Sequence, residues 1–256
     1  MKRELGIQVY SVFNHMQTKE DVESTFKKLA SYGYTQIHTA GEFSFGVEEY
    51  ARLAKESGLE VMGTHVSMDI LEDIDEAVRI HKILGTTNAG VGSMPKIWGE
   101  NFSKQDVFDF IKRANIVAEG LGKHGMKFTY HHHWMEFAKI GNDTIMDLMY
   151  KELNPKYTSF VLDTYWMQEG GVNILEWIEK YQGRLDILHL KDKGMNFAPF
   201  TGCITELGSG NINFKEVIRV ANETGVKYLC YEQDNNHKVD SLESAKQSAE
   251  YFFSIV

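Results

Sequence analysis

Short apolar runs alternate along the chain with longer segments in which apolar residues recur every three to four positions. Each short run is typical of a buried β-strand, and each longer segment is typical of an amphipathic helix. The predicted strands cover 5–10, 36–38, 59–65, 88–91, 126–131, 160–163, 185–189 and 226–232. The predicted helices cover 18–33, 47–57, 70–84, 103–121, 144–153, 174–181, 214–224 and 241–253. The pattern therefore predicts eight β-then-α units.

Strands that alternate with helices of this length pair in parallel through right-handed crossovers. Eight such units can close into a barrel, whereas an open doubly wound sheet usually has fewer units and a glycine-rich first turn. The first predicted strand is followed instead by Ser11-Val12-Phe13-Asn14, which cannot cradle a pyrophosphate. No linker-like stretch or shift in composition divides the chain. We therefore expect an α/β fold in which residues 1–256 form a single (β/α)8 TIM-barrel domain.

Composition and charge restrict the partners. The chain has 256 residues, 43% hydrophobic and 25% charged, with a formal net charge of −9 and no block of Lys and Arg. This charge disfavours nucleic acid and anionic membranes as partners. Two cysteines without CxxC spacing, and no apolar run long enough for a membrane span, favour a reduced, cytoplasmic protein.

Candidate chemistry lies where the predicted strands end. Asp163, His189 and Glu232 each close a predicted strand, and the C-terminal ends of barrel strands converge on one mouth. The fifth strand ends in the segment 130–137, Tyr-His-His-His-Trp-Met-Glu-Phe, so the fourth ligand could be Glu136 or one of the three histidines. Together these residues predict a divalent-metal site.

Such a set of carboxylates and imidazole suits Mn²⁺, Mg²⁺ or Co²⁺, with Zn²⁺ as a less well-matched choice. A divalent ion of this kind can bind the adjacent carbonyl and hydroxyl oxygens of a sugar and polarise the carbonyl, which acidifies the neighbouring C–H. A nearby Glu or His can then move the proton. Isomerisation, epimerisation and dehydration of sugars all begin with this step.

Several motifs resemble those of the xylose isomerase-like sugar phosphate isomerase/epimerase family, along nearly the whole chain. The motifs are His65, 130–133 with Glu136-Phe137, 162–166, 189–192 and 231–234. The resemblance implies a TIM barrel with one divalent metal held by Glu, Asp, His and Glu, the last three being Asp163, His189 and Glu232. Many members carry Glu-Asn-His at the fifth strand, which this chain lacks. A subgroup with Tyr-His-Asn-His…Glu-Phe is more similar and implies Glu136 as the first ligand, with His131 as the substitute.

The remaining roles follow from the same positions. Glu136, Glu232 and His133 are candidates for proton transfer, and His65, His131, Trp166 and Lys191 for substrate binding. Trp166 could stack on a sugar ring or simply pack at the rim, and Lys191 could bind a substrate oxygen or pair with a carboxylate. We also expect Asp192 to orient His189 and residues 207–211 to form a mobile loop. The histidines expected only at the surface or in packing are His15, His38, His81, His124 and His237.

The sequence thus predicts a metal-dependent isomerase or epimerase acting on a sugar, sugar derivative or keto-cyclitol through an enediolate. A lyase of the inosose dehydratase or 3-keto-glycoside-cleaving kind, and a non-enzymatic sugar-binding barrel, are the alternatives. The apurinic-site endonuclease branch of the family is disfavoured, because 88–93 offers no imidazole and the net charge is −9. The absence of a phosphate-binding motif favours an unphosphorylated substrate. The sequence leaves the oligomeric state open, although the resemblance makes a homodimer a candidate, since barrels of this family often pair.

Overall fold

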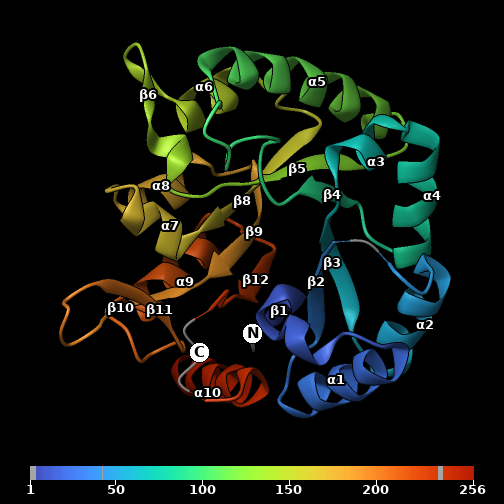
Figure 1. Cartoon of the computed structure of the whole chain (residues 1–256), viewed down its shortest axis with the longest axis vertical. Helices are drawn as coiled ribbons and strands as arrows, with labels where there is room; N and C mark the ends of the chain where they lie inside the picture. Colours follow the sequence, from blue (N-terminus) through green and yellow to red (C-terminus); the bar gives the residue numbers. More distant parts are fainter. Residues whose placement is uncertain (1–3, 42, 236–238) are drawn as a thin grey trace.

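The computed structural model of the protein describes residues 4–41, 43–235 and 239–256, so the prediction for His237 lies outside the described residues. Eight strands within these ranges form a closed barrel in which every neighbouring pair is parallel (Figure 1). The strands are β1 (Gly6–Gln8), β2 (Gln36–Ala40), β3 (Glu60–His65), β4 (Asn88–Val91), β5 (Lys127–His131), β8 (Thr158–Asp163), β9 (Leu185–Leu190) and β12 (Tyr228–Tyr231). Their order around the barrel follows their order in the chain, which confirms the predicted (β/α)8 TIM barrel.

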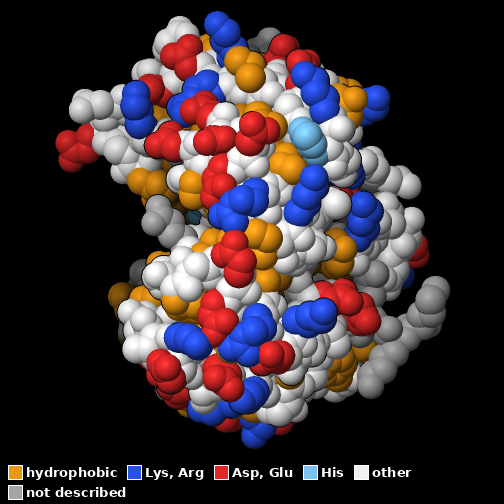
Figure 2. All heavy atoms as spheres, turned by 90° about the vertical axis from the view of Figure 1, so that its right-hand side faces the viewer, with side chains coloured by type: hydrophobic (Ala, Val, Ile, Leu, Met, Phe, Trp, Pro, Cys, Tyr) orange, Lys and Arg blue, Asp and Glu red, His pale blue; other side chains and the backbone are white. Residues whose placement is uncertain are grey.

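Helices surround the barrel as an outer ring (Figure 1). They are α1 (Lys19–Ser31), α2 (Val47–Glu56), α4 (Ile74–Leu84), α5 (Lys104–Gly122), α6 (Ile145–Glu152), α8 (Ile174–Lys180), α9 (Phe214–Glu223) and α10 (Ser241–Ile255). Capping boxes at Thr18, Ser103 and Thr144 fix where three of them begin. Positive and negative side chains intermingle on the outer face in Figure 2, as expected for solvated helix faces. No helix of the described residues is long and apolar enough to cross a membrane.

Some elements differ from the predicted ones. The predicted helix 70–84 is two helices, α3 (Met68–Glu72) and α4, because Asp73 leaves helical geometry and its carboxylate caps α4 at the Glu76 N–H. The first predicted strand stops at Gln8, where the 3₁₀ segment η1 (Val9–His15) begins. Further short elements were not predicted: η2 (Met135–Phe137), β6 (Lys139–Ile140), β7 (Asp143–Thr144), α7 (Thr164–Glu169), β10 (Asp192–Met195) and β11 (Gly202–Thr205).

A small apolar layer fills the inside of the barrel. It consists of Met62, Val161, Ile187 and Cys230, and it is separate from the larger core between strands and helices. The three predicted ligands Asp163, His189 and Glu232 each lie two residues after a member of this layer, namely Val161, Ile187 and Cys230. Because alternate strand residues share a face, the layer forms an apolar floor beneath the polar strand ends.

The Asp192 carboxylate holds a glycine-rich loop against the body of the protein. It accepts hydrogen bonds from the backbone N–H groups of Lys193, Gly208, Gly210 and Ile212, at 2.8, 2.9, 3.0 and 3.2 Å. The predicted partnership of Asp192 with His189 is therefore wrong, since its oxygens are already occupied by amides. The loop at 207–211 was expected to be mobile, but these hydrogen bonds tether it to Asp192.

Removing this tether is expected to loosen the loop selectively. Asp192→Ala deletes four charge-assisted hydrogen bonds, so the free energy of unfolding should fall by about 2 kcal/mol or more. Limited proteolysis should cut the variant within 207–212, and the Gly208 and Gly210 amides should lose hydrogen-exchange protection. Glu216→Ala, which changes a surface acid on α9, is the control. Unchanged proteolysis of the Asp192 variant would contradict the tether.

Candidate metal centre

Four buried side chains meet at the C-terminal ends of neighbouring strands. His131 closes β5, Asp163 closes β8, His189 lies near the end of β9, and Glu232 follows β12. One ligand atom from each lies within 4.8 Å of those of the other three. Asp163 and His189 are cross-strand partners in the β8–β9 register, which fixes their spacing through the sheet itself. The four form what we call the metal group.

Each imidazole of the metal group is oriented by a hydrogen bond on its far side. His131 donates from Nδ1 to the Gly92 carbonyl (3.1 Å), which leaves Nε2 facing the carboxylates without a hydrogen-bond partner among the described residues. His189 Nδ1 lies 2.7 Å from Glu232 Oε2, and its Nε2 lies 2.9 Å from His38 Nδ1. Partners of this kind set the ring orientation and tautomer of a ligating histidine.

Lys191 brings a positive charge to the same carboxylates. Its Nζ lies 3.0 Å from Asp163 Oδ2, 2.8 Å from Glu232 Oε2 and 2.9 Å from Asp234 Oδ2, and its side chain is 0% exposed. The ammonium also lies 4.9 Å from the centre of the Trp166 ring. Lys191 thus pairs with carboxylates, the second of its two predicted roles.

Neighbouring positive groups keep the two carboxylates of the metal group ionised. Burial would raise the pKa of Asp163, but Lys191 and His131 outweigh burial and hold that pKa below its ordinary value. Burial likewise opposes ionisation of Glu232, yet Lys191 and His189 hold its pKa well below the ordinary range. Burial raises the pKa of Asp234 to about 6. Asp163 and Glu232 are therefore carboxylates at neutral pH, the form that binds cations.

Glu136 does not join the metal group. Its Oε1 accepts a hydrogen bond from the Tyr130 hydroxyl (2.6 Å) and its Oε2 from the His133 backbone N–H (3.1 Å). Burial raises the pKa of this carboxyl. The structure therefore brings His131, the substitute in the sequence interpretation, to the place expected for Glu136. Both oxygens of Glu136 are thus engaged within the 130–137 turn, and Glu136 is not among the four grouped side chains.

Two substitutions separate these ligand assignments. Glu136→Gln keeps an oxygen for the Tyr130 hydroxyl, so Mn²⁺ affinity should change by less than about threefold. His131→Ala removes a member of the metal group and should weaken Mn²⁺ binding by about a hundredfold. Isothermal titration calorimetry of both variants checks this. The opposite ranking would return Glu136 to the metal.

A cavity of about 540 Å³ opens above the metal group. The residues that line it are Gln8, Tyr10, Ala40, His65, Gly92, Ser93, Trp98, His131, His133, Trp134, Trp166, Glu232, Asp234 and Asn235. None of these described lining residues is Lys or Arg. The cavity is therefore polar and acidic at its base and aromatic towards the outside.

The predicted substrate-binding residues take definite places in this cavity. His65 Nδ1 lies 3.2 Å from Gln8 Nε2, and its Nε2 has no hydrogen-bond partner among the described residues. His133 and Trp166 lie side by side, with ring centres 5.4 Å apart. His133 Nδ1 and Trp166 Nε1 are likewise buried without a hydrogen-bond partner in the described part of the chain. Burial lowers the pKa of His133, which keeps that imidazole neutral. These polar atoms are available to a ligand.

The metal group fits a divalent ion by its donor set. Two ionised carboxylates and two imidazoles match the oxygen and nitrogen ligands of Mn²⁺, Co²⁺ or Zn²⁺. The unpartnered Nε2 of His131 faces these carboxylates, at 3.6 Å from Asp163 and 3.8 Å from Glu232. A buried nitrogen without a hydrogen bond is costly unless a ligand satisfies it.

The sequence interpretation missed His38, Gln8 and Asp234. His38 was expected at the surface or in packing, but it is fully buried and contacts His189. His38 ends the predicted strand 36–38, the same signal that identified His65, although β2 itself continues to Ala40. Gln8 ends β1, and Asp234 lies two residues after Glu232.

Curated proteins similar to this chain are named inosose dehydratase. The curated relatives include inosose dehydratase of Geobacillus thermodenitrificans, 27% identical over 235 residues, which is 79% of this chain and 78% of the relative. Inosose dehydratase of Clostridium perfringens is 27% identical over 159 residues, 53% of this chain and 52% of the relative. The chain thus spans about half the length of the latter.

Solved structures share the whole barrel. A sugar phosphate isomerase/epimerase from Parabacteroides distasonis superposes with a TM-score of 0.83 at 23% identity, covering 99% of this chain and 94% of the other. D-Allulose 3-epimerase from Methylomonas sp. gives a TM-score of 0.73 at 14% identity, covering 100% and 98%. At these identities the likeness establishes the fold. A family model described as xylose isomerase-like TIM barrel matches residues 26–255, and the chain belongs to that family.

Proposed function

We propose that this barrel is a divalent-metal-dependent isomerase or epimerase of an unphosphorylated sugar, sugar derivative or keto-cyclitol, acting through an enediolate. The observation that carries the proposal is the metal group at the base of a cavity with unpartnered polar atoms. Family membership supports it, since relatives and structural neighbours are named as enzymes that act on such compounds.

His131, Asp163, His189 and Glu232 would hold the ion, and a set with two imidazoles suits Mn²⁺, Co²⁺ or Zn²⁺ better than Mg²⁺. When bound, the ion would polarise the substrate carbonyl and stabilise the negative charge that develops on its oxygen. His133 is the best-placed group to move the proton, because its ring lines the cavity and its Nδ1 has no hydrogen bond from a described residue. Glu232 lines the same cavity and is the second candidate.

Glu136 would act in this scheme by position rather than by contact with substrate. Its carboxylate fixes the backbone of His133 and the Tyr130 hydroxyl. Glu136 is not one of the described residues that line the cavity. His65 and Trp166 would bind substrate hydroxyls through their unpartnered nitrogens. Lys191 would keep Asp163 and Glu232 ionised.

The lining of the cavity supports an unphosphorylated substrate. A phosphate group needs Arg, Lys or a cluster of backbone N–H donors. The cavity offers carboxylates at Glu232 and Asp234 and neither Lys nor Arg among its described lining residues. Lys191 is fully buried and already surrounded by three carboxylates. A homodimer stays a prediction, as does the expected lack of nucleic acid and membrane partners.

Elimination of a β-hydroxyl is the second candidate function. Curated relatives named inosose dehydratase favour it. Both reactions begin with removal of the proton next to the carbonyl, and they differ in whether that proton returns or a hydroxyl leaves. An acid must then protonate the leaving oxygen, and Asp234, whose pKa burial raises to about 6, lines the cavity for this role.

Proton exchange in D₂O tests the shared step. Mn²⁺-loaded protein incubated with a panel of keto-sugars and inososes should incorporate deuterium next to the carbonyl, as followed by NMR. Products that retain every oxygen indicate isomerisation or epimerisation, and products lighter by one water indicate elimination. Ligand binding without any exchange or product would reject both reactions and leave the sugar-binding barrel.

A further inference from the structure

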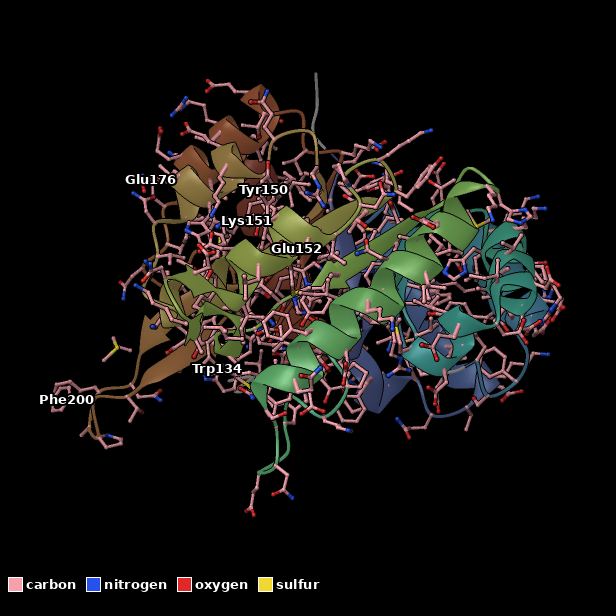
Figure 3. All side chains as sticks on the ribbon, turned by 90° about the horizontal axis from the view of Figure 1, so that it is seen from above. Trp134, Tyr150, Lys151, Glu152, Glu176 and Phe200 are labelled. Atoms are coloured by element: carbon pink, nitrogen blue, oxygen red, sulfur yellow. The ribbon has the colours of Figure 1, made fainter. Side chains whose placement is uncertain are left out.

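Two large aromatic side chains stand exposed at the outer end of the cavity. Trp98, on the loop between β4 and α5, is 57% exposed, and Trp134, just after β5, is 41% exposed. Their ring centres lie 5.4 Å apart, and both line the same cavity as His131 and Glu232. Figure 3 shows Trp134 near the start of α5, at the edge of the barrel. Exposed aromatic groups of this size beside a cavity indicate a binding surface.

These rings continue inward without a break. The ring centres of Trp134 and Trp166 lie 4.8 Å apart, and those of Trp98 and His133 also lie 4.8 Å apart. The ring centre of His133 lies 4.9 Å from that of His131 in the metal group. Trp98 is held in place because its Nε1 donates to Ser93 Oγ (3.2 Å). A cavity of about 540 Å³ falls within the range that holds drug-sized ligands, which are larger than one sugar ring.

We propose that Trp98 and Trp134 form a second subsite for a ring joined by a glycosidic bond to the ring at the metal group. The inference rests on the proposed function and adds that the substrate is a glycoside rather than a monosaccharide. The C–H face of a pyranose, or the face of an aryl group, stacks on indole without any charge. The outer cavity offers the indole rings of Trp98 and Trp134 for such stacking. No Lys or Arg is among its described lining residues, so an anionic substituent would find no basic side chain there.

Calorimetric titration of the Mn²⁺-loaded protein with three uncharged ligands tests the subsite. Methyl β-D-glucopyranoside fills only the inner position, whereas phenyl β-D-glucopyranoside and cellobiose add an aryl or a sugar ring. At least one of the two should bind about tenfold more tightly than the methyl glycoside, equivalent to about 1.4 kcal/mol. Trp98→Ala and Trp134→Ala should lower that affinity to the methyl level and leave methyl glycoside binding within about threefold.

The outcomes distinguish the ring sources and the two proposals. Tighter binding of the phenyl compound alone assigns an aryl group, and tighter binding of cellobiose assigns a second sugar. Phe108→Ala, an exposed aromatic of α5 outside the cavity, should change nothing. Equal affinity for all three ligands, no binding of any, or indifference to both tryptophan substitutions overturns the second subsite. Deuterium exchange on monosaccharides would still support the proposed function in each of those cases.

Discussion

Asp163→Asn is expected to weaken Mn²⁺ binding by at least about a hundredfold and to reduce proton exchange by about a thousandfold. The asparagine oxygen can still cap α7, because Asp163 Oδ1 accepts from the Trp166 N–H (3.0 Å). The lost charge is that of Oδ2, which lies 3.6 Å from His131 Nε2. Calorimetry with Mn²⁺ and the D₂O assay measure the two effects.

The same substitution at a surface ion pair serves as the control. Asp143→Asn removes a carboxylate that lies 2.7 Å from Lys151 on the outside of the barrel. Exposed pairs contribute about 0–1 kcal/mol, so this variant should bind Mn²⁺ as the parent does. A folded Asp163 variant with parental Mn²⁺ affinity would show that the metal group is structural.

Lys191→Met is expected to have opposite effects on stability and on metal affinity. Without Lys191, Asp163 and Glu232 face each other as buried carboxylates, which should lower the free energy of unfolding of the metal-free protein by about 3–5 kcal/mol. At a pH where both carboxylates stay ionised without Lys191, a cation that approaches them no longer meets a positive charge, so Mn²⁺ should bind about tenfold more tightly. Thermal unfolding with and without Mn²⁺ should show a larger stabilisation by the ion than in the parent.

Two further variants make the Lys191 result decisive. Lys191→Arg keeps the charge and should preserve the weaker Mn²⁺ affinity even if its size lowers stability. Lys193→Met removes a partly exposed lysine that pairs with Glu169 at 2.9 Å and should cost less than about 1 kcal/mol. If Lys191→Met leaves both stability and Mn²⁺ affinity unchanged, the lysine does not compete with the ion.

The barrel could be predicted because its signal is repeated eight times along the chain. Buried strands such as β8 and β9 contain short apolar runs, and capping residues such as Thr18 and Ser103 mark where helices begin. The short hairpin β10–β11 has no such repeat. It extends away from the barrel, with Phe200 at its far end in Figure 3. Among the described strands, β10 and β11 pair only with each other, so no periodic pattern predicts them.

The site could be predicted in part for the same reason. Asp163, His189 and Glu232 end apolar runs, and strand ends converge whatever the details of the loops. Glu136 and His131 lie five residues apart at the end of one strand, and only the hydrogen bonds of the turn decide which faces inward. His38 depends on a contact with β9, across 151 residues of sequence, which no local pattern contains.

The apolar floor of Met62, Val161, Ile187 and Cys230 determines the order in which a metal ion and a substrate would enter the site. It closes the barrel beneath His189 and Asp163, so an ion would reach these residues through the mouth, by the path that the proposed sugar substrate would also take. A sugar bound there would then block the ion from leaving. We therefore expect loading with metal to precede substrate, and release of metal to slow down whenever the mouth is occupied.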